Sequence, residues 1–459
     1  MVKYKAYPEY KDSGVEWLGD IPTHWDCTAL KRLCSLITGL TPPTQNEDNY
    51  ADEGYPWVRP EDLNESGFGT HASKYVSDIG WKLLRHIKPN STLICCIGTI
   101  GKCGYVKETV STNQQITAAT FRDCERFNYY LLQAARAQLE ELATGNVLKI
   151  LNSERLGALN VVKVNRKEAN TIAEFLDHET TKIDDLIEKQ QQLIELLKEK
   201  RQAVISHAVT KGLNPDVPMK DSGVEWLGDV PEHWRRSTPI KYLSSLKGRL
   251  GWQGLKADEY RDEGPYVVSS AHFNNYEIDW NSCPRVSLER YKLDSNIQLD
   301  VGDILLMKDG AAMGKLSYVD QLPGEACLNS HLLLFRPLMG GDEKTYDTKF
   351  MFYLMQTNHF QSFIKNNGTG STFLGISQQA IGNHSLCLPP YNEQVEISNY
   401  LDDELSKIVR LETMQLEMKN LLTERRTALI SAAVTGKIDV RDWAAPDTQD
   451  VDESQEATV

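Results

Sequence analysis

The chain has 459 residues, 41% hydrophobic and 25% charged, which is enough for two or three domains with ordinary cores. No stretch approaches the ~20 uninterrupted apolar residues of a membrane span, and no signal-peptide pattern is present, so we expect a cytoplasmic protein without a membrane partner. With 50 basic and 64 acidic residues the formal net charge is −14, which argues against non-specific coating of nucleic acid by a global positive field.

The sequence contains two copies of a shared frame. Residues 11–25 and 220–234 agree at 13 of 15 positions, and residues 174–211 and 399–436 agree at 17 of 38 positions without gaps. The segments between these blocks, 26–160 and 235–385, show only scattered similarity. A duplicated frame favours pseudo-two-fold symmetry, whereas unlike inserts favour two different targets. Neutral drift after duplication is the alternative interpretation.

The first insert contains a basic stretch with a strand-turn-strand pattern. Residues 82–107 include five basic residues and no acidic one. Within them, residues 92–97 are predicted to form a strand, followed by a glycine turn that ends at Lys102 and by another strand. A hairpin with a lysine at its tip is predicted to face DNA.

The second pair of blocks predicts two long helices. Their apolar residues recur on a heptad, and neither block contains an internal proline or glycine. The expected core positions are Leu176, Ile183, Leu197 and Val204 in the first copy and Leu401, Ile408, Leu422 and Leu429 in the second. Leu186, Ile187, Leu193, Ile194, Leu411 and Met418 are expected to fill the neighbouring position. The 29 residues from Leu176 to Val204 would span about 43 Å at ~1.5 Å per residue, a turn of DNA or somewhat more.

Gln190 and Gln415 each lie at the centre of one apolar stripe. In an antiparallel pair of helices they would lie opposite each other, where a buried polar pair lowers stability but fixes register. We therefore predict a two-helix antiparallel coiled coil in which these glutamines set the register. A solvated glutamine in an imperfect stripe is the alternative.

The second insert opens with a polarised basic segment. Residues 235–257 contain six basic residues and no acidic one, interleaved with aromatic residues and a glutamine. This composition suits phosphate contacts and the reading of base edges, although an ordinary solvated surface is an alternative. Further along, residues 303–307 are predicted to form a strand, followed by a glycine turn ending at Lys315 and another strand.

No catalytic constellation is visible in the chain. Residues 310–315 resemble a phosphate loop but are one residue short and lack the Ser or Thr that should follow the lysine, so nucleotide binding is rejected. Leu388 stands where a DNA methyltransferase loop needs a polar residue before Pro-Pro-aromatic, so Pro389 and Pro390 are predicted to start the second helix. The nine cysteines and ten histidines follow no metal spacing.

The frame blocks resemble the specificity subunit of type I restriction-modification systems. The resemblance is carried by Lys-Asp-Ser-Gly-Val-Glu-Trp-Leu-Gly-Asp-(Ile/Val)-Pro-x-His-Trp before each insert, by Pro-Pro-Tyr-Asn-Glu-Gln at 389–394, and by the Ala-Val-Thr ends of both helical blocks. It covers about residues 4–440. In the first copy, residues 164–169 depart from the Pro-Pro pattern, which puts only the start of that helix in doubt.

The resemblance implies a mixed α/β fold, with two globular target-recognition domains related by pseudo-two-fold symmetry and joined by two long antiparallel coiled-coil helices. The corresponding ranges are 1–165 for the first recognition domain, 166–212 for the first spacer helix, 213–388 for the second recognition domain, 389–440 for the second spacer helix, and 441–459 for an acidic tail. This tail holds six acidic residues and one basic residue and is expected to be disordered.

The resemblance also implies a non-catalytic reader of double-stranded DNA, with one domain per half of a split, asymmetric site. Two modification (methyltransferase) subunits and ATP-dependent restriction subunits would dock on it, with the exposed flanks of the helices as the expected interface. S-adenosylmethionine, ATP and Mg would bind to these partners and no cofactor or metal to this chain. The DNA-binding residues expected from their positions in the motifs are Arg59, Thr99, Lys102, Asn113 and Gln114 in the first domain and Lys247, Arg249, Trp252, Gln253, Lys256, Lys308, Asp309 and Lys315 in the second.

Three other classes of protein are weighed against this one. A coiled-coil scaffold, or an orphan DNA-binding protein without enzymatic partners, would share the frame but not the complex. A self-contained methyltransferase or nuclease would need a cofactor loop or a cluster of metal-binding carboxylates, and the sequence shows neither.

Overall fold

The computed structural model describes residues 4–66, 69–145, 147–224, 227–248, 255, 259–370 and 374–445. The chain forms two units. The first unit consists of residues 1–192 and 415–459, and the second unit consists of residues 193–414. Each unit therefore contains one frame block, one insert and parts of both long helices, α5 (Arg166–Lys211) and α10 (Tyr391–Val434).

Each frame block folds into the same short antiparallel pair of strands. In the first unit β1 (Tyr10–Asp12) pairs with β2 (Asp20–Pro22), and in the second unit β13 (Met219–Asp221) pairs with β14 (Asp229–Pro231). A tryptophan follows each pair, and both indoles, Trp25 and Trp234, are almost fully buried. The sequence identity of the two blocks thus reflects one structural motif that is used twice.

A carboxylate links each frame block to the first turn of a long helix; the Glu168 side chain is buried, whereas that of Glu393 is 24% exposed. Glu168 accepts a hydrogen bond from the Trp25 indole at 3.0 Å, and Glu393 accepts one from the Trp234 indole at 3.0 Å. These two glutamates are equivalent positions of the repeat, and each is the third residue of its helix, where the helix dipole favours a negative charge. Although residues 164–169 depart from the Pro-Pro pattern of the second copy, α5 therefore begins at the position of the repeat that is equivalent to the start of α10.

The two inserts share one topology although their sequences differ. The main sheet has the order β4-β11-β8-β9 in the first unit and β16-β24-β21-β22 in the second. A smaller sheet contains a parallel strand pair in both units, β10-β6 in one and β17-β23 in the other. The mixed α/β fold expected from the sequence is confirmed. The strands of the main sheets are β4 (Cys34–Thr38), β11 (Ile116–Phe121), β8 (Ser91–Cys95), β9 (Cys103–Val106), β16 (Ser244–Lys247), β24 (Leu332–Pro337), β21 (Ile304–Met307) and β22 (Leu316–Tyr318), and those of the smaller sheets are β10 (Ser111–Thr112), β6 (Tyr55–Val58), β7 (Tyr75–Val76), β5 (Tyr50–Ala51), β20 (Arg285–Val286), β17 (Tyr260–Val268) and β23 (Ala326–Leu328).

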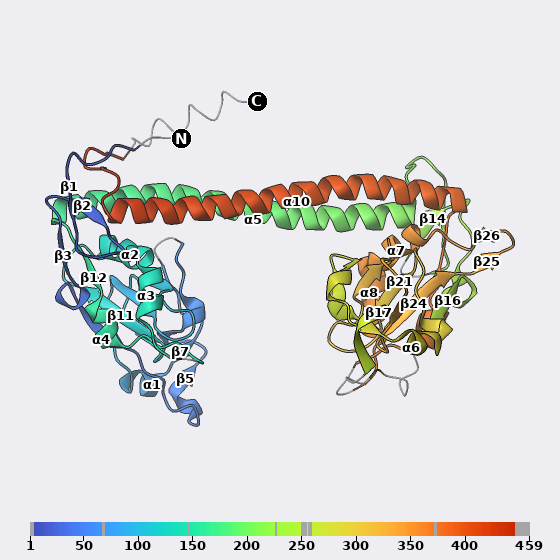
Figure 1. Ribbon diagram of the computed structural model, residues 1–459, viewed down its shortest axis with the longest axis horizontal. Helices are drawn as coiled ribbons and strands as arrows, with labels where there is room; N and C mark the ends of the chain where they lie inside the picture. The colour runs from blue at the N-terminus through green and yellow to red at the C-terminus, as the bar shows by residue number, and fades with distance from the viewer. Residues whose placement is uncertain are drawn as a thin grey trace. The chain divides into compact units, whose positions relative to one another are not determined.

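One helix in each insert joins the sheet to the long helices. These are α2 (Glu125–Ala134) and α7 (Thr348–Gln356), which lie between the main sheet and the long helices in Figure 1. The Tyr130 hydroxyl on α2 donates to Asp177 on α5 at 2.9 Å, and the Tyr353 hydroxyl on α7 donates to Asp402 on α10 at 2.5 Å. The same tyrosine-aspartate contact therefore fixes both inserts to their helices.

The long helices run antiparallel. In the first unit the Arg426 guanidinium contacts Asp184 at 2.8 Å and Lys419 donates to Gln191 at 2.7 Å, so residue numbers fall along α10 as they rise along α5. The buried seam includes most of the predicted heptad residues, namely Leu176, Ile183, Leu197, Leu401, Ile408 and Leu429.

The prediction was wrong for Leu186, Leu193, Leu411 and Met418, which are 39–48% exposed. A seam between two helices is only wide enough for one apolar stripe. On α5 the buried stripe includes Ile183 and Ile194. Leu186 and Leu193 lie beside this stripe and face solvent.

The register role of Gln190 and Gln415 stays a prediction. Both residues are half-buried on the seam side of their helices. The Gln190 side-chain oxygen is buried and has no hydrogen-bond partner among the described residues, whereas Gln191 beside it accepts from Lys419. A buried acceptor without a donor costs stability, as expected of a residue kept for register rather than for binding energy.

We expect the double substitution Gln190→Leu and Gln415→Leu to raise the melting temperature, because it removes a buried unsatisfied amide worth about 1–3 kcal/mol. Thermal unfolding of the full chain measures this, with the exposed Gln192→Leu as the matched control. Cysteine cross-links between the helices should then show more than one register, and a single unchanged register would contradict the proposed role.

We expect Glu168→Ala to lower the free energy of unfolding by about 2–4 kcal/mol, because it orphans several buried donors at once. Glu168 is 5% exposed and also accepts from the Tyr7 hydroxyl at 2.9 Å and the Asn165 amide at 2.9 Å. Urea unfolding followed by tryptophan fluorescence measures the loss. The exposed Glu174→Ala on the same helix should stay within about 0.5 kcal/mol of the unsubstituted chain.

Candidate nucleic-acid interface

The predicted strand-turn-strand is present in both units. In the first unit β8 and β9 form an antiparallel hairpin, and in the second unit β21 and β22 form its counterpart. Gly101 and Gly314 occur at the ends of the two turns with φ of +78° and +94°, a backbone region that favours glycine. Each turn ends with the predicted lysine, Lys102 or Lys315.

Both hairpin lysines are held by a neighbouring loop. The Lys102 ammonium donates to the carbonyl of Pro60 at 3.2 Å. The Lys315 ammonium donates to the carbonyls of Ser270 at 3.1 Å and Phe273 at 3.0 Å. These loops occupy equivalent places after β6 and β17, so two inserts of unlike sequence position a lysine in the same way.

The base of the second hairpin is fixed by a buried ion pair. Asp303, 1% exposed, receives two hydrogen bonds from Arg336 of β24 at 2.7 and 2.6 Å. Burial raises the pKa of Asp303, although the contact with Arg336 acts in the opposite direction. In the first hairpin, burial raises the pKa of Cys96 to about 11 and that of Cys103 well above its usual value, so these thiols are neutral at pH 7.

A second pair of equivalent segments, which begin at Asn113 and Asn329, lies beside the hairpins. The backbone N–H of Asn113 donates to the carbonyl of Val58, and the backbone N–H of Asn329 donates to that of Val268. The residues that follow contact the start of the turn, where the backbone N–H of Cys96 donates to the Gln115 carbonyl at 2.7 Å and the backbone N–H of Lys308 donates to the His331 carbonyl at 3.1 Å. The structure thus brings the predicted Asn113 and Gln114 next to the hairpin of Thr99 and Lys102.

The predicted residues of the first unit differ in accessibility. Thr99 and Gln114 are exposed, and Gln114 accepts from the Thr41 hydroxyl. Asn113 is 7% exposed and its amide donates to Gln115, so its side chain stabilises the turn and does not project from the surface. Arg59 caps a short 3-10 helix and contacts Glu61 at 2.9 Å.

In the second unit the structure adds a residue that the sequence did not identify. His331 lies 2.6 Å from Asp309, and the Lys308 ammonium lies 3.9 Å from the same carboxylate. The spacing of the histidines gives no sign of this contact, and only the pairing of β21 with β24 shows that residue 331 lies beside residue 308. Lys247 ends β16 and is half-buried, while the predicted Arg249, Trp252, Gln253 and Lys256 lie outside the described residues.

A basic cleft of about 850 Å³ adjoins the second hairpin. Its lining includes Lys198, Arg201, Lys315 and Lys365 with a single carboxylate, Glu412. The residues described here contain no group of three or more His, Cys, Asp or Glu that could hold a metal ion. Within the same part of the chain, no helix is long and apolar enough to cross a membrane. The described part of the site offers cationic and amide groups for binding.

Two copies of an α/β recognition domain, each with a lysine hairpin and joined to long helices, define a class of bipartite nucleic-acid readers. The chain matches the family model described as "Type I restriction modification DNA specificity domain" over residues 22–196 and 253–418, and it belongs to this family. It is a specificity subunit that recognises DNA sites, and subunits of this kind are the non-catalytic components of methyltransferase and restriction complexes and hold no cofactor of their own.

Curated relatives match nearly the whole chain. The MjaIX specificity subunit of Methanocaldococcus jannaschii is 22% identical over 465 residues, covering 96% of this chain and 99% of that protein. The EcoKI specificity subunit of Escherichia coli is 22% identical, covering 83% of this chain and 82% of that one. A solved structure concerned with complex assembly and conformational transition of the type I R-M system is similar in fold, with a TM-score of 0.62, 16% identity, and coverage of 91% of this chain and 99% of that one.

The acidic tail begins later than the sequence indicated. Arg441 pairs with Asp439 at 2.7 Å, and the Trp443 ring packs edge-on against Phe175 at 5.8 Å. These contacts belong to residues that the prediction had assigned to a disordered segment. Residues 446–459 lie outside the described part of the chain.

Proposed function

We propose that each unit reads one half of a split, asymmetric site in double-stranded DNA through its lysine hairpin and the segment beside it. The observation that carries this proposal is the equivalence of the two hairpins, whose lysines are held by loop carbonyls in domains of unlike sequence. A shared geometry with different exposed side chains is what two half-sites of different sequence require.

The chemistry of the exposed groups supports a division of labour between positioning and reading. A lysine ammonium has three donors, and in Lys315 two are used by the Ser270 and Phe273 carbonyls, which leaves one for a DNA phosphate. Gln114, Asp309 and His331 carry amide, carboxylate and imidazole groups that can pair with base edges in the major groove. Phosphate contacts would set the register of the domain, and these side chains would supply the sequence preference.

We further propose that the exposed stripe of the long helices binds two copies of one partner, the modification subunit. Three pairs of exposed apolar residues are exact equivalents of the repeat: Leu186 and Leu411, Leu193 and Met418, and Leu196 and Leu421. Exposed apolar residues at helical spacing mark a protein-binding face, and a duplicated face suits two identical partners. The restriction subunits would join this assembly, and ATP, Mg and S-adenosylmethionine would bind to the partners. We infer that the complex works in the cytoplasm, where chromosomal DNA is accessible.

The deciding experiment is co-expression of this chain with its modification subunit, followed by mapping of adenine methylation across a genome. We expect a split, asymmetric motif. Replacing residues 26–160 with the insert of another family member should change one half of the motif only. A complex that methylates no defined motif, or a motif that changes in both halves, would favour a scaffold or an orphan DNA-binding protein.

Two substitutions should separate phosphate contacts from base contacts. Lys315→Gln should weaken binding to every sequence and reduce the salt dependence by about one counterion, because it neutralises one phosphate contact. Gln114→Ala should instead relax one base position at a cost of about 1–3 kcal/mol with an unchanged salt slope. Binding isotherms at several salt concentrations test both, and identical behaviour of the two variants would refute the assignment.

A further inference from the structure

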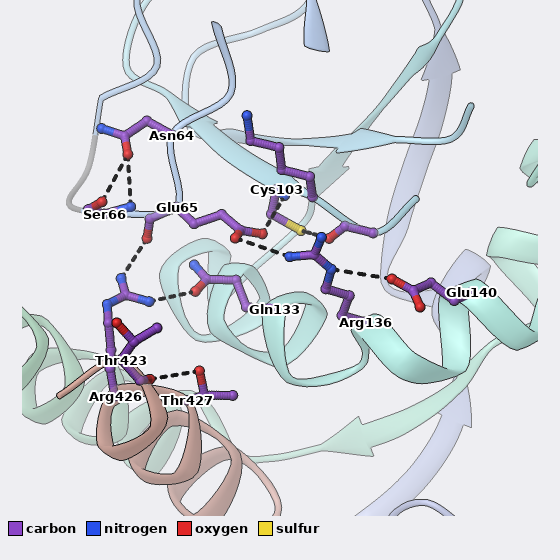
Figure 2. A network of polar contacts seen from close by, with 12 residues as sticks. Asn64, Glu65, Ser66, Cys103, Gln133, Arg136, Glu140, Thr423, Arg426 and Thr427 are labelled. Atoms are coloured by element: carbon purple, nitrogen blue, oxygen red, sulfur yellow. Dashed lines mark hydrogen bonds and ion pairs between the residues drawn. The ribbon is translucent and has the colours of Figure 1, made fainter. Parts of the chain in front are cut away.

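In the first unit Arg426 of α10 links the spacer helices to the recognition domain. Figure 2 shows its guanidinium pointing from the helix toward the loop of Glu65 and toward α2. It donates to the backbone carbonyl of Glu65 at 2.5 Å, to the Gln133 side chain at 3.3 Å and to Asp184 of α5 at 2.8 Å. The Arg426 side chain is only 11% exposed, so these contacts lie in a poorly solvated place.

The loop that Arg426 holds reaches directly to the hairpin lysine. The Glu65 carboxylate accepts from the backbone amide of Cys103 at 3.0 Å and lies 3.4 Å from Arg136 (Figure 2). Cys103 follows Lys102, whose ammonium donates to Pro60 in the same loop. Two hydrogen bonds, both through Glu65, therefore connect α10 to the strand that begins after Lys102.

The second unit has an arginine at the equivalent position of the repeat, Arg201 of α5. Its guanidinium lies 5.0 Å from the centroid of the Tyr276 ring. The Tyr276 carbonyl accepts from the Tyr318 amide and the Ser317 hydroxyl, both at 2.9 Å. These residues belong to β22, the strand that begins after Lys315. The connection again runs from the helix to a loop and from the loop to the strand beside the lysine.

We propose that Arg426 and Arg201, here called the arginine latch, are positioning residues that set where the hairpin lysines lie relative to the spacer helices. The inference rests on the proposed function of the hairpins. Each arginine acts through the loop that it contacts. Each arginine fixes the loop that receives its lysine, so that half-site recognition in each unit depends on a residue of the shared frame.

The divergence of the contacts favours this role over simple anchoring. Asp184, the carboxylate partner of Arg426, is replaced by Val409 at the equivalent position, and the target loops differ in sequence. The arginine is nevertheless kept, and it reaches its loop by hydrogen bonds in one unit and by a cation–π contact in the other. Arginine suits both because its planar guanidinium donates in a fixed fork and also stacks on aromatic rings.

The test compares methylation of DNA by the full complex with its modification subunits, using sites that carry single-base changes in either half. Arg426→Lys keeps the charge but loses the fork, and we expect it to reduce discrimination in the first half-site about five- to tenfold, part of what one mismatched base pair normally gives. The second half-site should be unaffected. Arg201→Met should produce the reverse pattern.

The matched control is Lys419→Ala, because Lys419 also bridges α10 to α5 through Gln191 but makes no side-chain hydrogen bond to the described residues of the recognition domain. It should leave discrimination in both half-sites unchanged. In a Lys102→Ala background, Arg426→Lys should cause no further loss of discrimination, because the phosphate contact of Lys102 sets the register in which the neighbouring side chains read bases. This non-additivity is a readout that a purely structural role would not produce.

Unchanged discrimination in Arg426→Lys, or equal relaxation of both half-sites, would overturn the latch. If Lys102→Ala itself leaves discrimination and affinity unchanged, the proposed function of the hairpin fails instead, so the two failures are distinguishable. If Arg426→Lys yields no folded complex, Gln133→Leu removes one partner of the guanidinium and keeps the other two. This variant should reduce discrimination in the first half-site to a smaller degree. Unchanged discrimination would again refute the latch.

Discussion

The glutamate in the first turn of each long helix makes the contact on which the rest of each unit depends. Glu168 and Glu393 accept hydrogen bonds from the buried indoles of Trp25 and Trp234. Around these contacts the frame block also reaches the end of the other helix, since Lys437 donates to the Leu18 carbonyl in the first unit and Lys211 to the Asp229 carbonyl in the second. The start of one helix and the end of the other thus meet at one motif. A carboxylate removed from water needs such donors, because an unpaired buried charge would cost more than the contact contributes.

This arrangement explains why the frame is constant while the inserts vary. The frame needs particular residues at particular places, whereas an insert needs only a suitable pattern of buried strand residues and one tyrosine to reach the helix. Tyr130 and Tyr353 meet this requirement through Asp177 and Asp402. Surface loops between those fixed points can change without loss of the core. A reader that must acquire new target sequences benefits from this separation of positioning and recognition.

Much of the fold followed from the sequence because repetition and periodicity are local signals. The repeated blocks, both helices, the two hairpins and their glycine turns could be read directly. The exposed Leu186 and Leu411 could not, since heptad spacing does not tell which of two adjacent stripes a single seam will bury. The burial of Asn113 and the approach of His331 to Asp309 also escaped prediction, because both result from pairing between strands far apart in the chain. Side-chain position in such pairs depends on tertiary register rather than on local pattern.

The unlike contacts of the two units suggest how a duplicated reader can keep its geometry while its targets diverge. A hydrogen bond to a backbone carbonyl, as between Arg426 and Glu65, places no demand on the side chain of the loop. A cation–π contact, as between Arg201 and Tyr276, demands only an aromatic ring. The loop carbonyls that receive Lys102 and Lys315 are likewise indifferent to sequence. Because the contacts that position each hairpin use backbone groups and broad side-chain classes, the residues exposed toward DNA can change without moving the hairpin that presents them.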